Sequence, residues 1–110
     1  DPSRGGSLLD HTTILAFSEF GRTPLVNSRG GRDHSLTSSC MMLGAGVPHN
    51  KVVGASGDVG MPPRAIDPVS GAADDAGVII SPTLVAASLM QGAGYDPSAY
   101  RVDGLPCLMT

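Results

Sequence analysis

One short apolar run limits what this chain can fold into. Residues 12–17, Thr-Thr-Ile-Leu-Ala-Phe, are apolar and partly β-branched, with the length and composition of a buried strand. A single strand needs neighbours on both sides to satisfy its backbone hydrogen bonds, and the rest of the chain offers few other strands. The run therefore predicts part of an α/β sheet that extends beyond these 110 residues.

A long polar loop, residues 18–34, follows this strand directly. It contains Ser18-Glu19-Phe20-Gly21-Arg22-Thr23 and then Arg32-Asp33-His34, with Pro24, Asn27, Gly30 and Gly31 as turn formers. In open α/β sheets, ligands bind beyond the carboxyl ends of the strands. Loops of this length in compact domains are usually functional or disordered. We therefore expect a functional site here.

Two further elements are predicted before the end of the chain. The apolar residues 36–43 predict a short helix, with Asp33 or Ser35 as its N-cap and Gly44 closing it. Residues 51–54 predict a short strand. Residues 55–77 show no period and predict an irregular surface excursion with room for a small hairpin.

The clearest prediction is a helix in the last third of the chain. Ser81 is its expected cap, Pro82 its first residue, and Gly92 or Gly94 its end. The domain is predicted over residues 12–106, between a flexible lead-in, 1–11, and a tail, 107–110. Because the chain starts at Asp1 without a methionine, we expect a fragment or a processed piece.

Composition excludes several classes of partner. A net charge of −3 without a cluster of lysine or arginine argues against nucleic acid and acidic membranes, and neither a signal peptide nor a membrane span is visible. Fifteen glycines and nine prolines predict a loop-rich fold. Cys40 and Cys107 fit two reduced thiols or one disulfide, and Cys40, in an apolar stretch, is interpreted as a buried structural thiol.

The polar loop contains side chains that suit metals and anions. Glu19 and His34 are oxygen and nitrogen donors for divalent metals, and Asp33 is a third candidate. Arg22 and Arg32 can offer planar forks to phosphate or sulfate. A metal ion beside a guanidinium group suits phosphoryl or sulfuryl transfer, because the negative charge that develops during the reaction must be neutralised. The alternative is structural, with Glu19 and Arg22 as a loop salt bridge and Asp33 only a helix cap.

The other two histidines are set apart from this site. His11 precedes the strand, so six residues at ~3.3 Å each place it roughly 20 Å from Glu19, and we expect it to pair with Asp10 at the surface. His49 lies in a Pro-His-Asn turn, where an exposed side chain is expected. Ser18 has no histidine at a fixed offset, and no Gly-x-Ser-x-Gly elbow is present.

The residues from His11 to Pro24, followed by Gly30-Gly31-Arg32-Asp33-His34, resemble the C-terminal part of the bacterial domain-of-unknown-function family 1501. The resemblance covers residues 8–106. That family is similar to the alkaline phosphatase and sulfatase superfamily. The resemblance therefore implies an α/β fold, the C-terminal portion of a three-layer sandwich that does not fold independently.

The superfamily resemblance also implies roles for individual residues. Ser18-Glu19-Phe20-Gly21 takes the place of a Ser-Asp-His-Gly motif whose Asp and His bind metal, and His34 takes that of a later histidine ligand. Glu19 can still ligate, whereas Phe20 cannot. The nucleophile and the remaining ligands of the superfamily come from segments outside this chain, so we expect no catalytic nucleophile here.

Two functions follow from these observations. The first is a segment of a metal-dependent hydrolase acting on a phosphate or sulfate ester, with Zn, Mn or Ca held by Glu19, Asp33 and His34, and Arg22 and Arg32 binding the anion. Its partners would be a small anionic ester and the remainder of the parent protein. The alternative is a non-catalytic binding or assembly protein that keeps the fold. The resemblance implies export to the periplasm in either case.

Overall fold

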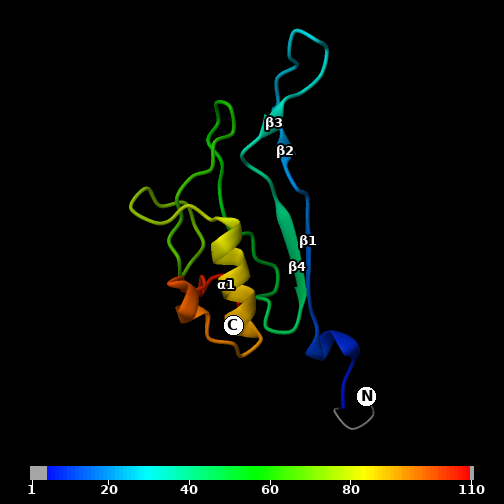
Figure 1. Ribbon diagram of the computed structural model, residues 1–110, viewed down its shortest axis with the longest axis vertical. Coiled ribbons are helices and arrows are strands. Elements are labelled where there is room, and N and C mark those ends of the chain that lie inside the picture. The colour runs from blue at the N-terminus through cyan, green and yellow to red at the C-terminus, as the bar shows by residue number, and fades with distance from the viewer. Residues whose placement is uncertain (1–4, 110) are drawn as a thin grey trace.

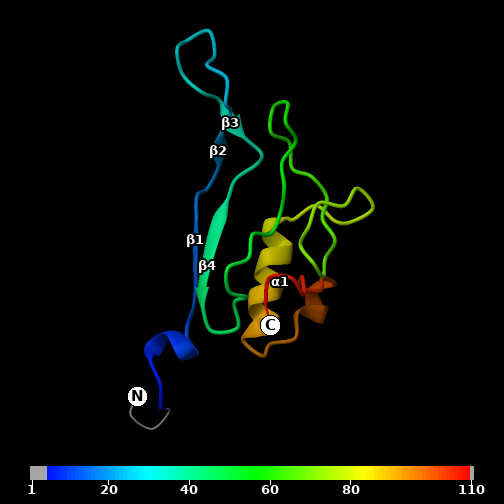
Figure 2. The same ribbon diagram turned by 180° about the vertical axis from the view of Figure 1, so that it is seen from behind.

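The computed structural model describes residues 5–109 of the chain. Its elements follow the order η1 (Leu8–His11), β1 (Thr13–Phe17), β2 (Gly21–Arg22), β3 (His34–Ser35), β4 (Cys40–Gly44), α1 (Pro82–Gly92) and η2 (Pro97–Tyr100). The strands form a long ribbon along one side of the molecule, and α1 lies beside it with the loops of the C-terminal half (Figures 1 and 2). The fold is therefore mixed α/β. The predicted lead-in, 1–11, and tail, 107–110, fall partly outside the described residues.

Strand β1 forms where the apolar run predicted it. It pairs antiparallel with β4, from Thr13 opposite Gly44 to Phe17 opposite Cys40. The expectation of a buried strand is wrong for this chain, because β1 has β4 as its one strand neighbour among the described residues. The Phe17 side chain is 72% exposed, because strand side chains project from the faces of the sheet and nothing in the described residues covers Phe17.

The helix predicted over residues 36–43 is wrong. These residues contain the whole β3–β4 connection, residues 36–39, and most of β4, which is extended. The register places Met41 opposite Ala16 and Leu43 opposite Ile14, so apolar cross-strand pairs outweigh the local pattern. Three consecutive Ser/Thr residues, 37–39, also weaken a helix.

Neither of the caps expected for that helix has a helix to cap. The Ser35 Oγ accepts a hydrogen bond from Thr37 N at 3.2 Å, which turns the chain between β3 and β4. Gly44 is the last residue of its element, as predicted, but that element is strand β4 and not a helix. Its φ of 100° and a neighbouring Thr12 carbonyl oxygen leave no room for a side chain.

The predicted C-terminal helix is confirmed as α1. The Ser81 Oγ accepts from Leu84 N at 3.3 Å, Pro82 is the first residue, and Gly92 is the last. Residues 51–54 do not form the predicted strand; there Gly54 N donates to Gly71 O at 3.1 Å. Residues 55–77 are irregular as predicted, with isolated bridges such as Ser56 to Pro63.

The buried core lies under α1 rather than around β1. Ile66, Leu105 and Cys107 are almost fully buried, and Val53, Ile80, Leu84 and Leu108 pack against them. Ser88 on α1 is the buried polar residue here, at 1% exposure. Its Oγ donates to Leu84 O at 2.7 Å and accepts from Leu105 N at 2.8 Å, so it ties the helix to the C-terminal segment.

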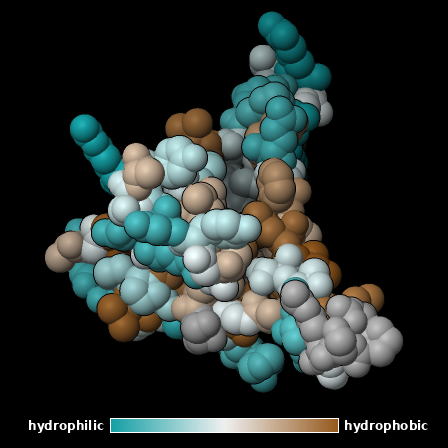
Figure 3. Space-filling view, turned by 60° about the horizontal axis from the view of Figure 1, so that its bottom comes forward, coloured by the Kyte–Doolittle hydropathy of each residue, from teal (hydrophilic) through white to brown (hydrophobic). Residues whose placement is uncertain are grey.

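The ribbon, by contrast, keeps apolar side chains at the surface. On one face of β1 and β4, the pairs Ile14–Leu43 and Ala16–Met41 are all exposed. Hydrophobic side chains, in brown, reach the surface below the protruding end of the ribbon (Figure 3). Among the described residues, no helix has the length and apolar character needed to cross a membrane.

We predict that Ser88→Ala lowers the free energy of unfolding by about 1–3 kcal/mol, because Leu105 N loses its acceptor inside the core. Chemical denaturation followed by circular dichroism measures the change. Thr83→Ala, which removes an exposed hydroxyl from the same helix, is the control and should change stability by no more than about 0.5 kcal/mol. An unchanged midpoint for Ser88→Ala would contradict the prediction.

Candidate functional site

The two sequence motifs meet across strands β2 and β3. The strands are antiparallel, with Gly21 opposite Ser35 and Arg22 opposite His34. Gly21 lies against the carbonyl oxygen of Thr37, where a side chain would collide with backbone. The glycine of the first motif is therefore what allows the two segments to approach, and the pairing places Arg22 of the first motif opposite His34 of the second.

Phe20 and His34 stack on one another beside these strands. Their ring centroids are 3.7 Å apart and the ring planes are inclined by 17°. The guanidinium carbon of Arg22 lies 4.8 Å from the Phe20 centroid, within the range of a cation–π contact. Phe20 thus covers one face of the imidazole. The ring nitrogens lie at the edge of that ring, so stacking leaves them accessible to a ligand.

Both arginines use part of their guanidinium on the tip loop, residues 23–33. The Arg22 Nη1 donates to Arg32 O at 2.8 Å, and the Arg32 Nη1 donates to Pro24 O at 2.5 Å and to Thr23 O at 3.3 Å. Both residues are exposed, and a guanidinium carries five N–H groups. Each arginine consequently combines a structural contact with donors that remain for an anion.

The structural alternative for Glu19 and Arg22 is wrong, because no ion pair joins them in the described part of the chain. The salt bridge found there links Arg64 to Asp75 at 2.9 Å, well away in sequence. Glu19 follows β1 as an exposed residue. Its carboxylate is thus not committed to the arginine of its own motif.

Asp33 is held by Asn27, a residue that the sequence marked only as a turn former. The Asn27 Nδ2 donates to Asp33 Oδ1 at 2.8 Å. The Asn27 Oδ1 accepts from the backbone N of Arg29 and of Gly31, both at 3.0 Å. The signal was present in the chain, since an asparagine ahead of a glycine-rich turn commonly bonds to backbone two residues on. The hydrogen bond between Asn27 and Asp33, across the turn, could not be predicted from the neighbouring residues alone.

The donors expected to bind a metal do not form a complete metal site. Glu19, Asp33 and His34 are of suitable types, and all three are exposed. Nevertheless, residues 5–109 contain no cluster of three or more histidine, cysteine, aspartate or glutamate side chains that could hold a metal ion. A metal here would need ligands from elsewhere in the protein.

The two remaining histidines lie apart from this site. The His11 Nε2 is 3.0 Å from Gly5 O in the region of η1, at the opposite end of the ribbon from β2 and β3 (Figure 1). Ser7 N donates to the Asp10 carboxylate at 2.6 Å, and this hydrogen bond, with a smaller contribution from the charge of the neighbouring His11, lowers the pKa of Asp10. His49 is exposed in its turn, as expected.

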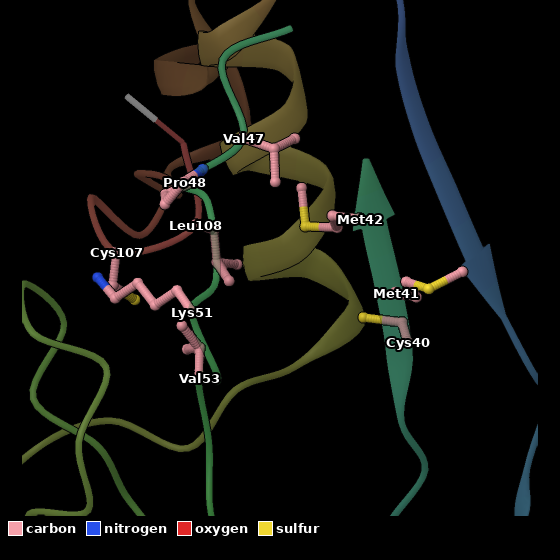
Figure 4. A pocket seen from close by; sticks show the side chains of 9 residues that line it. All are labelled: Cys40, Met41, Met42, Val47, Pro48, Lys51, Val53, Cys107 and Leu108. Carbon is pink, nitrogen blue, oxygen red and sulfur yellow. The ribbon is translucent and has the colours of Figure 1, made fainter. Parts of the chain in front are cut away.

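The cysteines are both free, and the interpretation of Cys40 as a buried thiol is wrong. Cys40 is exposed on β4, whereas Cys107 is buried in the core. They line opposite sides of a cavity of about 220 Å³ together with Met41, Met42, Val47, Pro48, Lys51, Val53 and Leu108 (Figure 4). Burial raises the pKa of the Cys107 thiol, and the nearby charge of Lys51 opposes that shift only in part.

One comparison with known proteins gives a match. A family model described as "Protein of unknown function (DUF1501)" matches residues 4–73, a stretch that contains β1 to β4 and every candidate site residue. No curated protein and no solved structure matches the chain.

We predict that Gly21→Ala separates β2 from β3, because the new methyl group would collide with the Thr37 carbonyl oxygen. The expected cost is about 1–3 kcal/mol, typical of overpacking. Amide hydrogen exchange over residues 20–36 should accelerate. Gly31→Ala is the matched control, since its nearest atoms lie 3.8 Å away on the Asn27 side chain. Equal exchange in the two variants would rule out the close approach at Gly21.

Proposed function

Since the chain belongs to the family described as protein of unknown function (DUF1501), we propose a function from its own residues: a part in the hydrolysis of a phosphate or sulfate ester. The observation that carries this proposal is the pairing of Arg22 with His34 across β2 and β3. It joins a fixed cation to an imidazole at an exposed edge. Such a pair suits an anionic ester whose negative charge grows during the reaction.

The arginines would bind the ester. Their remaining N–H donors can reach two oxygens of a tetrahedral anion, and their backbone contacts to the tip loop limit the rotamers that must be ordered on binding. The ester's charge would therefore be met by groups that are already in place. This preorganisation supports recognition of phosphate or sulfate rather than of a neutral ligand.

Two further parts of the proposal concern a bound metal ion and the fold of the parent protein. We propose that His34 and Glu19 supply part of a ligand set for a divalent ion, completed by residues elsewhere in the protein, and that the chain is a portion of an alkaline-phosphatase-like sandwich. The exposed apolar face of β1 and β4 supports the second point, because such a face is normally covered. The nucleophile would also come from outside the described residues.

A second function, binding without catalysis, is favoured by one observation. Phe20 stacks on His34 where a second ligand would be expected, and it offers no donor atom. In that case the arginines would still bind an anion, while the metal and the hydrolysis would be missing. Both functions include binding of the anion by the arginines, but only hydrolysis requires a bound metal ion.

We predict that His34→Ala in the full-length protein removes bound zinc, manganese or calcium and lowers ester hydrolysis on the order of 100-fold. Elemental analysis by mass spectrometry and the release of 4-nitrophenol from its phosphate and sulfate esters give the two readouts. His49→Ala, which changes an exposed turn histidine, should alter neither. If the wild-type protein binds phosphate but neither metal nor ester turnover is found, the binding function replaces the hydrolase.

We further predict that Phe20→His raises zinc affinity by at least about tenfold, equivalent to ~1.4 kcal/mol. The reason is proximity: the present ring centroids are 3.7 Å apart, and two imidazoles this close could share one ion once a ring turns out of the stack, because each nitrogen lone pair lies in the plane of its ring. Competition with a chromogenic chelator measures the affinity. Combining the change with His34→Ala should abolish the gain, whereas Phe20→Leu should produce none. A gain that survives without His34 would contradict the shared site.

A further inference from the structure

The side-chain amide of Asn27 is a centre of hydrogen bonding in the tip loop, beside the contacts of Arg22 and Arg32. Asn27 makes three side-chain hydrogen bonds, two through Oδ1 to backbone N–H groups and one through Nδ2 to Asp33. Its own backbone adds two more, since Asn27 N donates to Gly31 O at 2.7 Å and its carbonyl accepts from Gly30 N at 3.0 Å. No other side chain in the loop has as many partners among the described residues.

These bonds also determine which way the amide faces. Two N–H donors from Arg29 and Gly31 converge on one atom of the side chain, so that atom must be the oxygen. The nitrogen is thereby turned toward the Asp33 carboxylate. The donor in this pair is therefore Asn27, and the acceptor is Asp33.

Asp33 connects the hydrogen-bonded loop to strands β2 and β3. Its backbone oxygen accepts from Thr23 N at 2.9 Å, one residue beyond the register pair of Arg22 and His34. Its side chain is tied to the loop by Asn27. A change in the Asn27–Asp33 contact can thus reach the Arg22–His34 pair through Asp33 and Thr23, which directly flank β3 and β2.

We infer that Asn27 is a positioning residue for the anion site and that Asp33 acts as its hydrogen-bond partner rather than as a ligand. The consequence for anion binding rests on the proposed function, whereas the ordering of the loop does not. On this inference the negative charge of Asp33 is dispensable, provided that the hydrogen bond between positions 27 and 33 is kept. A ligand role would require the carboxylate at position 33 itself.

Exchanging the two side chains separates these roles. Asn27→Asp keeps an oxygen for the Arg29 and Gly31 N–H groups but loses the donor and sets two carboxylates side by side. Asp33→Asn removes the charged acceptor. The double variant, Asn27→Asp with Asp33→Asn, restores one hydrogen bond with its direction reversed. Asn50→Asp, in an exposed turn, is the control for added charge.

The experiment uses the full-length protein and two measurements. Hydrogen exchange of peptides covering residues 23–33 reports loop order, and titration calorimetry with inorganic phosphate reports the anion site. Asn27→Asp should speed exchange roughly three- to tenfold, the effect of one lost hydrogen bond, and should weaken phosphate binding. The double variant should recover both properties, and Asn50→Asp should change neither.

Two outcomes would overturn the inference. If the double variant exchanges as fast as Asn27→Asp, the contact does not order the loop. If its loop is protected but phosphate still binds weakly, the carboxylate of Asp33 acts at the site directly. A wild-type protein that does not bind phosphate contradicts the proposed function instead, and the exchange data then decide the role of Asn27 alone.

Discussion

The antiparallel pairing of β1 and β2 with β4 and β3 is the interaction on which the rest of this structure depends. It carries the chain out along one strand and back along the next, and so brings Arg22 opposite His34. Two glycines make it possible. Gly21 lies against Thr37 O and Gly44 against Thr12 O, and a Cβ at either position would collide with backbone. The site is thus built by the close approach of two segments rather than by a helix or a cavity.

Local signals in the sequence predicted some of the fold. Helix α1 was predictable because its determinants are contiguous: Ser81 caps it, Pro82 begins it, and Gly92 ends it. The helix predicted over residues 36–43 was wrong because the strand partners of its second half lie more than twenty residues away in β1, beyond the reach of any local pattern. The same distance explains Cys40, whose apolar neighbours indicated burial although the ribbon leaves it exposed.

For the candidate site, the sequence indicated the types of residue but not their geometry. The polar loop after β1 indicated where to look, and Arg22 and His34 do meet there. What the sequence could not show is how their neighbours are used. The guanidinium of Arg32 turns back onto the carbonyls of its own loop, and Asn27 binds Asp33. These are contacts across a turn whose conformation is set by several weak preferences acting together.

Phe20 bears on both functions proposed for the candidate site. Its ring fills the place beside His34 and lies under the Arg22 guanidinium, so it stabilises the pair at the cost of a donor atom. An aromatic residue there favours anion recognition by the arginine, because the guanidinium is held in place by the ring face. Because Phe20 offers no donor atom, a metal ion bound at His34 would also need ligands from other parts of the protein. The apolar face of β1 and β4 points to the same conclusion, since a surface of that kind is normally covered by further protein. If the proposed hydrolase function holds, catalysis would therefore depend less on the residues of the tip loop than on the groups that the rest of the protein would place opposite His34.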